Sequence, residues 1–474
     1  MASFATLLAP EEIERIHTAS LEVLENIGLL VRNGRARERF ARHGCMVDAA
    51  SGIVRFPRAL VEEFRVACPP TFTFHGRDPR RDRTVPDDRP LLSTSGAAPN
   101  VIDPDDRRER RACAEDIALI AQLIEELPGY DLFSISAIAD DAPSDCYHLW
   151  RYYPALRHCT KPVTGSAPNA TEAKAIYELG CLIAGGESAY RERPFITYIC
   201  CPVASPLTMD VDSTEMLMTF VEQGLPCYTA FPPNAGLTAP LTLAGTLVQA
   251  NAEFLAQLVL IQMTRLGTPS LYCLLPTVTD LRKGAYAPGG IETGILMMAC
   301  AQMARYYSVP CAGYVGLTNA KVNDAQAGYE TGMSALAAVL GGVDILKTGG
   351  LLDALMAFDF AKAVIDSEIG QMLKRVVRGV EFSIENLALD AIAEAGPGGT
   401  FVDKGHTVRH MRTVPFLPDI ADREPRNRWL AAGALDSDAR AMQRAREILS
   451  CDSAALFTSE VEARLRARFR DLPG

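Results

Sequence analysis

The sequence predicts an α/β fold, a (β/α)8 TIM barrel with a helical N-terminal preface and a helical C-terminal extension. Two observations support this prediction. Short apolar runs recur through the middle of the chain, and the segments between them have apolar residues at every third or fourth position. Strands that are apolar on both faces and alternate with helices are typical of a parallel sheet. We therefore expect a helical N-terminal segment over residues 1–85, the barrel over residues 86–360, and a helical extension packed on the barrel over residues 361–474.

The preface is expected to be helical because its apolar residues follow a helical period. They end at Gly28 and are Ile13, Ile16, Leu21, Leu24 and Ile27. Pro57 opens a further short helix, which Pro69 and Pro70 close. Beyond the barrel, helical patterns return over residues 361–380 and 436–450.

Eight apolar runs predict the strands of the barrel. They lie near Leu91 and over residues 132–139, 162–165, 195–200, 226–230, 270–275, 309–315 and 343–347. Helical patterns fill the intervals, as in Leu247, Ala250, Phe254, Leu258 and Ile261, which share one face and end before Gly267. An open doubly wound sheet is the competing fold. The absence of both a Gly-x-Gly-x-x-Gly turn and a Walker phosphate loop disfavours it.

Composition limits the classes of function. A net charge of −11 argues against a nucleic-acid partner, because phosphate binding needs an electropositive face. The 13 cysteines include no Cys-x-x-Cys pair, which fits reduced thiols in the cytoplasm. The first residues lack a basic leader, and no stretch of about 18 uninterrupted apolar residues occurs, so we expect a cytoplasmic protein with no membrane association. We also expect a homo-oligomer.

The stretch TNAKVNDAQAGYE, residues 318–330, places polar side chains directly after an apolar strand. In a barrel, the active site collects where strands hand over to their loops. If the strand stops near Gly316 and a helix begins near Asp324, the side chains of Asn319, Asp324, Gln326 and Glu330 converge, and we take these four as candidate catalytic residues. The alternative is that Asp324 caps the helix and Glu330 is solvated on its flank.

Aromatic residues fall in or just after several predicted strands. Tyr198, Tyr228, Phe231 and Tyr314 are candidates to line one cavity. Clustered rings bind a quaternary ammonium by cation–π attraction, worth ~0.5–2 kcal/mol per ring. The alternative is that each ring fills the core.

His406 and His410 have the spacing of a helical pair of metal ligands, and Asp403 is close enough in sequence to be a third. Glycines break the string PGGTFVDKGHT around His406, so we favour His406 as a lining residue of the pocket and predict no metal site. A nucleophilic serine or cysteine has little support, since no Gly-x-Ser-x-Gly elbow occurs.

Several blocks of this sequence, in order, resemble the trimethylamine methyltransferase family of corrinoid-dependent methyltransferases. The blocks are GIVRFPRALVEEF with HGRDP, AGLTAPLTLAGTLVQANAEFL, TNAKVNDAQAGYE, GGVDILKTGGLLD, and PGGTFVDKGHT with the segment 418–429. The resemblance implies a (β/α)8 barrel that moves a methyl group from an amine to the Co(I) of a corrinoid, or cobalamin, carried by a partner protein. No cofactor is then bound tightly by the chain itself.

One departure from the family pattern bears on the substrate. Founding members carry pyrrolysine in or just before the stretch that resembles residues 316–319, whereas this chain has only standard residues there. The resemblance therefore implies the non-pyrrolysine branch, whose methylated-amine substrates are quaternary amines such as glycine betaine, and His406 becomes a candidate contact for a substrate carboxylate. Two alternatives stay open, a metal-dependent lyase or hydrolase on the same barrel and a non-catalytic protein that binds methylated amines.

Overall fold

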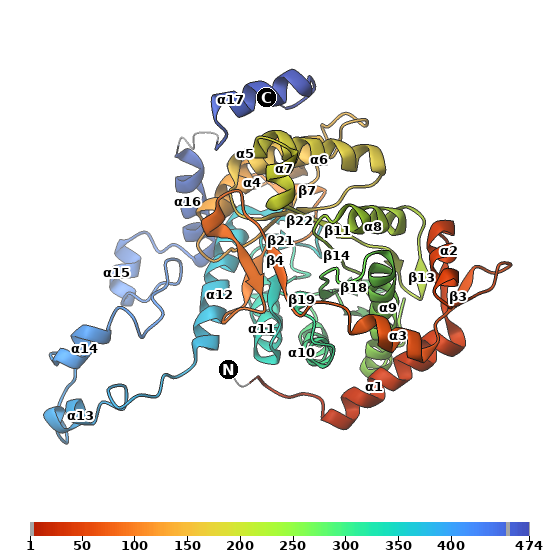
Figure 1. The fold of residues 1–474 in the computed structure, drawn as a ribbon. Coiled ribbons are helices and arrows are strands. Elements are labelled where there is room, and N and C mark those ends of the chain that lie inside the picture. The colour runs from red at the N-terminus through yellow and green to blue at the C-terminus, as the bar shows by residue number, and fades with distance from the viewer. Residues whose placement is uncertain (1–3, 452–455, 474) are drawn as a thin grey trace.

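The computed structural model describes residues 4–451 and 456–473. Residues 1–3 and 474, at the outer ends of the predicted N-terminal and C-terminal segments, and residues 452–455 lie outside the described residues. Within the described part, eight parallel strands form a central barrel surrounded by helices (Figure 1). The strands are β6 (Leu91–Ser93), β9 (Phe133–Ser134), β10 (Val163–Gly165), β11 (Ile196–Cys200), β14 (Cys227–Thr229), β16 (Tyr272–Leu274), β19 (Cys311–Tyr314) and β20 (Ile345–Lys347).

Two sheets join to close the barrel. One has the order β14-β11-β10-β9 and the other the order β16-β19-β20-β6, and all these neighbours are parallel. Parallel bridges between Ser93 and Leu132 and between Phe231 and Leu274 link the two sheets at both seams. The strands therefore follow one another in chain order around a closed ring, and the predicted (β/α)8 barrel is confirmed.

Helices cover the outside of the barrel, each after its strand. They are α4 (Ala114–Glu126), α5 (Leu149–His158), α6 (Ala170–Ala184), α7 (Glu187–Glu192), α8 (Asp212–Gln223), α9 (Leu243–Thr264), α10 (Ile291–Tyr306), α11 (Ala325–Gly341) and α12 (Phe360–Arg378). Among the described residues, α9 alone has the length and hydropathy of a membrane span. Since 78% of its apolar window is buried inside the protein, α9 has the burial of a core helix.

The N-terminal segment adds a small sheet to the predicted helices. α1 (Pro10–Glu22), which continues as the π-helix η1 (Val23–Ile27), packs on α9 together with α2 (Gly34–Arg42) and α3 (Arg58–Arg65). The sheet consists of β1 (Leu29–Val31), β2 (Met46–Val47) and β3 (Ile53–Arg55) with β12 (Val203–Ala204) and β13 (Thr208–Met209), which follow β11. These strands of two or three residues are too short to show an alternating pattern in the sequence.

A hairpin fills the N-terminal end of the barrel. Its strands β4 (Phe72–Phe74) and β5 (Arg83–Val85) are antiparallel and flank the 3-10 turn η2 (Pro79–Arg81). The rings of Phe72 and Phe74 lie 6.1 and 6.3 Å from the ring of Tyr228 inside the barrel. The hairpin belongs to one buried cluster with inward-facing residues of the strands, among them Leu91, Leu132, Ala230, Leu271, Ala312 and Ile345. Apolar side chains therefore close this end, which leaves the C-terminal end for a site.

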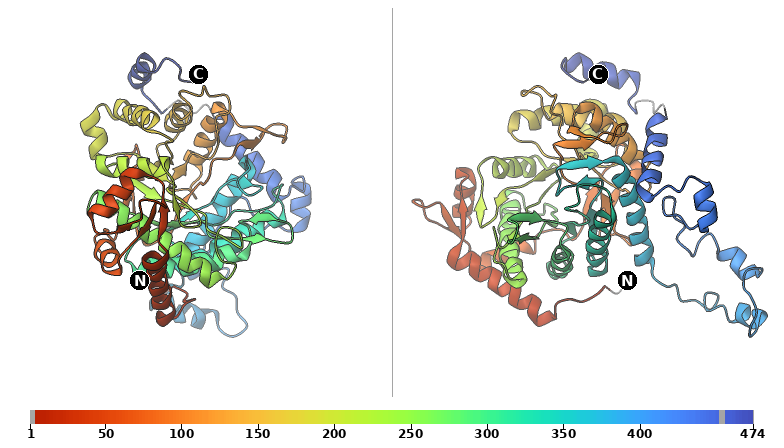
Figure 2. Two further views of the ribbon diagram at one scale, coloured as in Figure 1. Left: turned by 90° about the vertical axis from the view of Figure 1, so that its right-hand side faces the viewer. Right: turned by 180° about the vertical axis from the view of Figure 1, so that it is seen from behind.

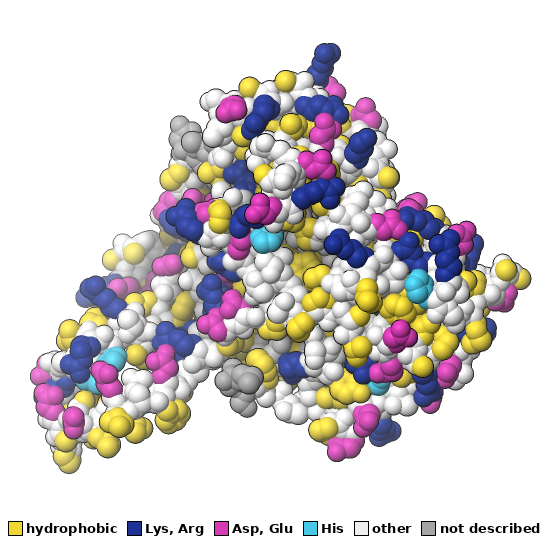
Figure 3. Space-filling model, viewed as in Figure 1, with side chains coloured by type: hydrophobic (Ala, Val, Ile, Leu, Met, Phe, Trp, Pro, Cys, Tyr) yellow, Lys and Arg dark blue, Asp and Glu magenta, His cyan; other side chains and the backbone are white. Residues whose placement is uncertain are grey.

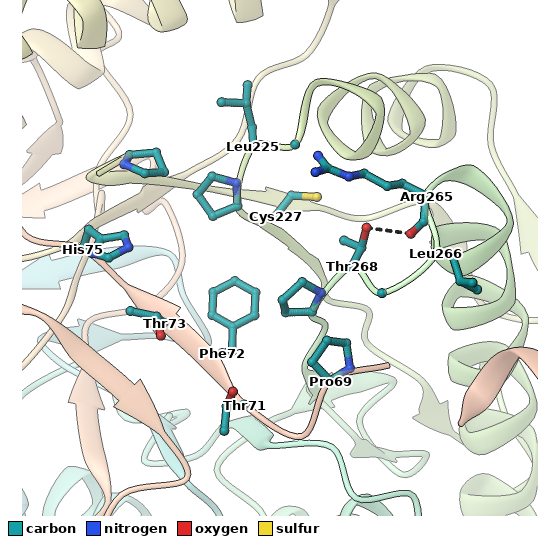
Figure 4. A pocket seen from close by; sticks show the side chains of 15 residues that line it. Pro69, Thr71, Phe72, Thr73, His75, Leu225, Cys227, Arg265, Leu266 and Thr268 are labelled. Carbon is teal, nitrogen blue, oxygen red and sulfur yellow. Dashed lines mark hydrogen bonds between the residues drawn. The ribbon is translucent and has the colours of Figure 1, made fainter. Parts of the chain in front are cut away.

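A cavity of about 390 Å³ lies beside this hairpin, where β11, β14 and β16 begin (Figure 4). Phe72, Leu225 and Cys227 contribute apolar surface to it. His75 in its lining pairs with Asp82 at 2.9 Å, and the Thr268 hydroxyl donates a hydrogen bond to the backbone carbonyl of Arg265 at 2.7 Å. Active sites of (β/α)8 enzymes lie at the opposite end of the barrel. We therefore interpret this cavity as the seam between hairpin and barrel.

Loops at the C-terminal end of the barrel carry two more small sheets. One has the order β21-β22-β7-β8, and the other has the order β15-β17-β18. Their strands are β7 (Asn100–Ile102), β8 (Glu109–Arg111), β21 (Leu351–Leu352), β22 (Ala357–Asp359), β15 (Asn234–Ala235), β17 (Thr277–Asp280) and β18 (Ala285–Ala287). These sheets come from the loops after β6, β14, β16 and β20, so they shape the rim of the barrel.

The C-terminal extension is only partly packed on the barrel. α12 is itself the last helix of the barrel, which therefore runs beyond residue 360 to about residue 378. Residues 379–435, with α13 (Leu389–Ala395), α14 (Gly405–His410) and α15 (Arg426–Ala431), form an arm whose helices project away from the barrel (Figures 1 and 2). Residues 413–421 of the arm are hydrogen-bonded to α12. α16 (Ser437–Ser450) returns to pack on α12 and α4, and α17 (Ser459–Arg468) packs on α6. Hydrophobic side chains are exposed along the arm (Figure 3). Phe382 and Ile384 are among them.

Candidate active site

Several inward-facing residues at the C-terminal end of the barrel keep exposed surface. Ile199 on β11 and Tyr314 on β19 pack against the interior cluster but keep exposed surface. Cys201, which follows β11, is exposed as a residue. Its thiol points into the protein, and this burial raises the thiol pKa to about 11. From the exposed surface of these inward-facing residues we infer a recess that opens at the mouth of the barrel. We call the site formed by Ile199, Cys201, Tyr314 and the adjacent buried Tyr228 and Lys347 the mouth recess.

Lys347 is the charged group of this recess. It is the last residue of β20 and is 1% exposed. Its Nζ atom lies 5.3 Å from the ring centroid of Tyr228 and 5.2 Å from that of Tyr314. Burial lowers the pKa of this lysine. The two rings that we expected to face a substrate cation thus already face the amino group of a lysine of the protein itself.

The groups near Lys347 are neutral. Burial raises the pKa of the Cys201 thiol to about 11 and that of the Cys273 thiol to about 12, so both remain protonated at neutral pH. Burial also raises the pKa values of the Tyr228 and Tyr314 hydroxyls well above their ordinary value. None of these four neighbours therefore offers Lys347 a negative charge.

Three of the four candidate catalytic residues meet at the rim of the mouth. Glu330 Oε2 accepts hydrogen bonds from Thr318 Oγ1 at 2.5 Å and from the Asn319 amide at 2.8 Å. Gln326 Nε2 donates to Glu330 Oε1 at 3.0 Å. Asn319 in turn donates through Nδ2 to the Tyr286 carbonyl at 2.8 Å. This network joins the loop after β19 to the β17–β18 hairpin, so it holds two sides of the rim together.

Asp324, the fourth candidate, caps α11. Its side chain accepts hydrogen bonds from the amides of Gln326 at 2.9 Å and Ala327 at 3.3 Å, which satisfies the free donors of the first helical turn. The helix begins at Ala325, next to the predicted start. The Asp324 side chain is exposed, and it caps the helix without joining the hydrogen-bond network around Glu330.

The structure places the other candidates away from the recess. Tyr198 lies on the helix side of β11, stacked on Phe220 of α8 with 4.0 Å between ring centroids. Phe231 is 2% exposed and belongs to the core shared with the surrounding helices. His406 lies on α14 in the projecting arm, with its ring 4.5 Å from that of His410. These three side chains are therefore not brought together with Tyr228 and Tyr314.

The separation of Tyr198 from Tyr228 has a simple cause. Successive side chains of a strand point to opposite faces, and both faces of a barrel strand are buried. The register pairs Tyr198 with Cys227, the neighbour of Tyr228, so the two tyrosines point to opposite sides of the barrel wall. Hydrophobicity alone does not distinguish an interior position from a helix-facing one.

The two histidines do not form a metal site with Asp403. No group of three or more His, Cys, Asp or Glu side chains that could hold a metal ion occurs within residues 4–451 and 456–473. The arm that carries His406 and His410 projects from the barrel (Figure 2). The metal-dependent alternative thus has no ligand set at the barrel mouth.

Lys347 is the functional candidate that the sequence analysis missed as a site residue. The signal was present in GGVDILKTGG, where a lysine ends an apolar strand. Lysine is seldom fully buried without a partner. A lysine at the C-terminal end of a predicted barrel strand is therefore a site candidate in its own right.

A closed (β/α)8 barrel with a charged and aromatic recess at its C-terminal mouth defines an enzyme of the TIM-barrel class. Residues 2–470 match the family model described as trimethylamine methyltransferase (MTTB). The chain belongs to this family and is a methyltransferase, as the resemblance of its ordered blocks predicted.

Relatives and solved structures agree with this assignment. The chain is 31% identical to trimethylamine methyltransferase MttB of Desulfitobacterium hafniense (strain DSM 10664 / DCB-2), covering 96% of this chain and 92% of that one. It is also 31% identical to a glycine betaine methyltransferase of D. hafniense (strain Y51), covering 97% and 96%. The monomethylamine methyltransferase MtmB of Methanosarcina barkeri superposes with a TM-score of 0.54 at 12% identity, covering 93% of this chain and 92% of MtmB, and so supports the fold.

Proposed function

We propose that this methyltransferase moves a methyl group from a quaternary amine, such as glycine betaine, to the Co(I) of a corrinoid carried by a partner protein. The observation that carries the proposal is the mouth recess, an aromatic site with exposed surface at the C-terminal end of the barrel. The similarity over nearly the full length to a glycine betaine methyltransferase supports the same substrate class.

The recess suits a substrate that needs orientation more than activation. A Co(I) corrinoid, when its carrier protein is docked, supplies the nucleophile that takes the methyl group. The nitrogen of a quaternary amine keeps the electron pair of the broken bond and leaves as a neutral tertiary amine, so no side chain has to donate a proton. The protein's task is to bind the substrate and to aim one methyl group outward. Tyr314 is half-buried at the recess and can contact the substrate with its exposed surface.

The open mouth fits a corrinoid bound by a partner rather than by this chain. Cys201 and Ser166, which follow β11 and β10, are exposed at this end of the barrel, so the strand ends are not sealed by the chain's own loops. We propose that the rim network of Asn319, Gln326 and Glu330 sets the shape of the mouth for this docking. Asp324 contributes by starting α11 at the right place.

The first experiment is methyl transfer to chemically reduced cobalamin under anaerobic conditions. Glycine betaine, choline and trimethylamine are offered in turn, and methylcobalamin is followed by absorbance. We expect turnover with glycine betaine and none with trimethylamine. Turnover with trimethylamine equal to that with glycine betaine would contradict the assigned substrate class. Binding of glycine betaine without any methylcobalamin, with the cognate corrinoid protein also present, would instead favour the non-catalytic binding protein.

Paired variants test the rim. Glu330→Ala removes the acceptor of three hydrogen bonds and is expected to lower kcat/KM at least tenfold. Asp324→Ser keeps a helix cap and is expected to retain activity, because serine is among the preferred capping residues. Loss of activity in Asp324→Ser would indicate a catalytic role for Asp324. An unchanged kcat/KM in Glu330→Ala would remove the rim network from the proposal.

A further inference from the structure

Lys347 differs from the other buried lysines in having no oxygen partner. Lys161 Nζ donates to the carbonyls of Ile124 and Leu127 at 2.5 and 2.9 Å. Lys362 Nζ lies 2.7 Å from Asp366, and the less buried Lys374 lies 2.6 Å from Asp131.

In contrast, Lys347 Nζ has neither a hydrogen-bond acceptor nor a carboxylate partner among residues 4–451 and 456–473. It faces the rings of Tyr228 and Tyr314 at 5.3 and 5.2 Å.

An ammonium group has three donors, and aromatic faces replace its hydration only in part. Burying a charge without a counter-charge is unfavourable, and proteins retain such groups where a ligand completes them. An oxygen anion would supply both an acceptor and a counter-charge. It has to come from outside the chain, because the four neighbouring groups, Cys201, Cys273, Tyr228 and Tyr314, are neutral at physiological pH.

We propose that Lys347 is an anion subsite of the mouth recess and binds the carboxylate of a zwitterionic methyl donor. This inference rests on the proposed function and narrows it from quaternary amines in general to those that carry a carboxylate. Lys347 contacts the carboxylate end of the substrate, away from the reacting methyl group. It therefore determines specificity and orientation and takes no part in the methyl transfer.

The charge of Lys347 also fixes the direction in which the substrate lies. A quaternary nitrogen beside the ammonium of Lys347 is repelled, while a carboxylate there is attracted. Lys347 is nearly inaccessible, whereas Tyr314 and Cys201 keep exposed surface toward the mouth. A betaine therefore enters with its carboxylate inward and its methyl groups outward, where a docked acceptor can reach them. A quaternary amine that ends in a hydroxyl lacks this anchor.

Three ligands test the contributions of the quaternary nitrogen and the carboxylate to binding separately. Glycine betaine has both charges, choline keeps the quaternary nitrogen without the carboxylate, and 3,3-dimethylbutyrate keeps the carboxylate with carbon in place of nitrogen. Binding of each to the full-length protein is measured by calorimetry without cobalamin. The variants are Lys347→Met and, as a matched control, Lys174→Met, because Lys174 is exposed on α6, one of the helices outside the barrel.

For the wild type and Lys174→Met, we expect glycine betaine to bind about 100-fold more tightly than choline, the ratio typical of a hydrogen-bonded charge pair. Lys347→Met should lose about 100-fold in affinity for glycine betaine, lose 3,3-dimethylbutyrate binding, and change little toward choline. Circular dichroism and thermal melting report whether the variant is folded, and Lys347→Arg, which restores the charge, should regain part of the preference.

Either of two results overturns the anion subsite. One is a folded Lys347→Met variant that binds glycine betaine as the wild type does. The other is a wild-type protein that binds choline as tightly as glycine betaine, or that binds neither carboxylate ligand. The methyl-transfer assay is separate, so carboxylate-selective binding without transfer would leave the subsite in place and remove the proposed function. Transfer from glycine betaine with equal KM in wild type and Lys347→Met would leave the proposed function in place and remove the anion subsite.

Discussion

The ion pair between Lys362 and Asp366 allows a quantitative test of how α12 supports the mouth of the barrel. The two side chains are 2% and 1% exposed, and Lys362 Nζ lies 2.7 Å from Asp366 Oδ2. Lys362 Nζ also donates to Thr331 Oγ1 on α11 at 3.0 Å. Asp366 Oδ2 accepts a hydrogen bond from the amide of Gly350, in the loop after β20, at 2.8 Å. The pair thus ties α12 to α11 and to the loop that follows Lys347.

Removing one partner of this pair leaves the other charge buried. Asp366→Ala is therefore expected to lower the free energy of unfolding by about 3–5 kcal/mol, the usual cost of breaking a buried ion pair from one side. The double variant Lys362→Met/Asp366→Ala removes both charges. Its main remaining defect is the unpaired Gly350 amide, which costs about 1–3 kcal/mol. The double variant should therefore be more stable than the single one.

Urea unfolding followed by far-ultraviolet circular dichroism measures these differences as shifts of the transition midpoint. Glu38→Ala is the matched control, because Glu38 pairs with Arg42 on the surface at 3.5 Å with both side chains at least 70% exposed. The control should leave the midpoint unchanged. A double variant that is less stable than Asp366→Ala would refute the reasoning, since it would show that an unpaired Lys362 does not destabilise the fold.

Three further predictions concern pH, the aromatic recess and the rim. Burial raises the pKa of Glu253 to about 7, so the folded chain holds a proton that the unfolded chain releases near pH ~4.3. The stability from this proton is complete at low pH and is lost as pH rises toward about 7, and Glu253→Gln should flatten the melting temperature across that window in a calorimetric pH series. Tyr314→Leu should weaken glycine betaine binding by about 5- to 30-fold, equivalent to ~1–2 kcal/mol, whereas Phe231→Leu, away from the recess, should stay within about twofold; equal losses in calorimetry would exclude Tyr314 as a contact. A Cβ atom at Gly289 would lie 2.4 Å from Glu330 Oε2, so Gly289→Ala should speed hydrogen exchange over residues 318–330, and unchanged exchange would count against the network.

Elements with a local cause were predictable from neighbouring residues. The barrel strands follow from apolar runs, because a strand buried on both faces is apolar throughout. The start of α11 follows from Asp324, whose side chain caps the next turn. The course of α9 follows from the helical period of its apolar residues. In each case, the residues that decide the structure are within a few positions of one another in the chain.

The candidate site was less predictable, because it depends on the direction of side chains. Asn319, Gln326 and Glu330 meet as expected, since they flank one short loop. Tyr198 and Tyr228 look alike in the sequence, yet only Tyr228 points into the barrel. The extension beyond α12 contains helical patterns, but nothing in them indicates that the segment with His406 leaves the barrel surface.

Periodicity and apolar content were sufficient to place the strands and outer helices of the barrel, and the resemblance of the ordered blocks indicated the family. They carry information about spacing along the chain. Closure of the barrel, the register of its strands and the approach of Lys347 to two tyrosine rings depend on contacts between residues far apart in sequence. A lysine ends β20 in the sequence, but only the packing of β14 and β19 around it buries its amino group between two tyrosine rings, without an oxygen partner.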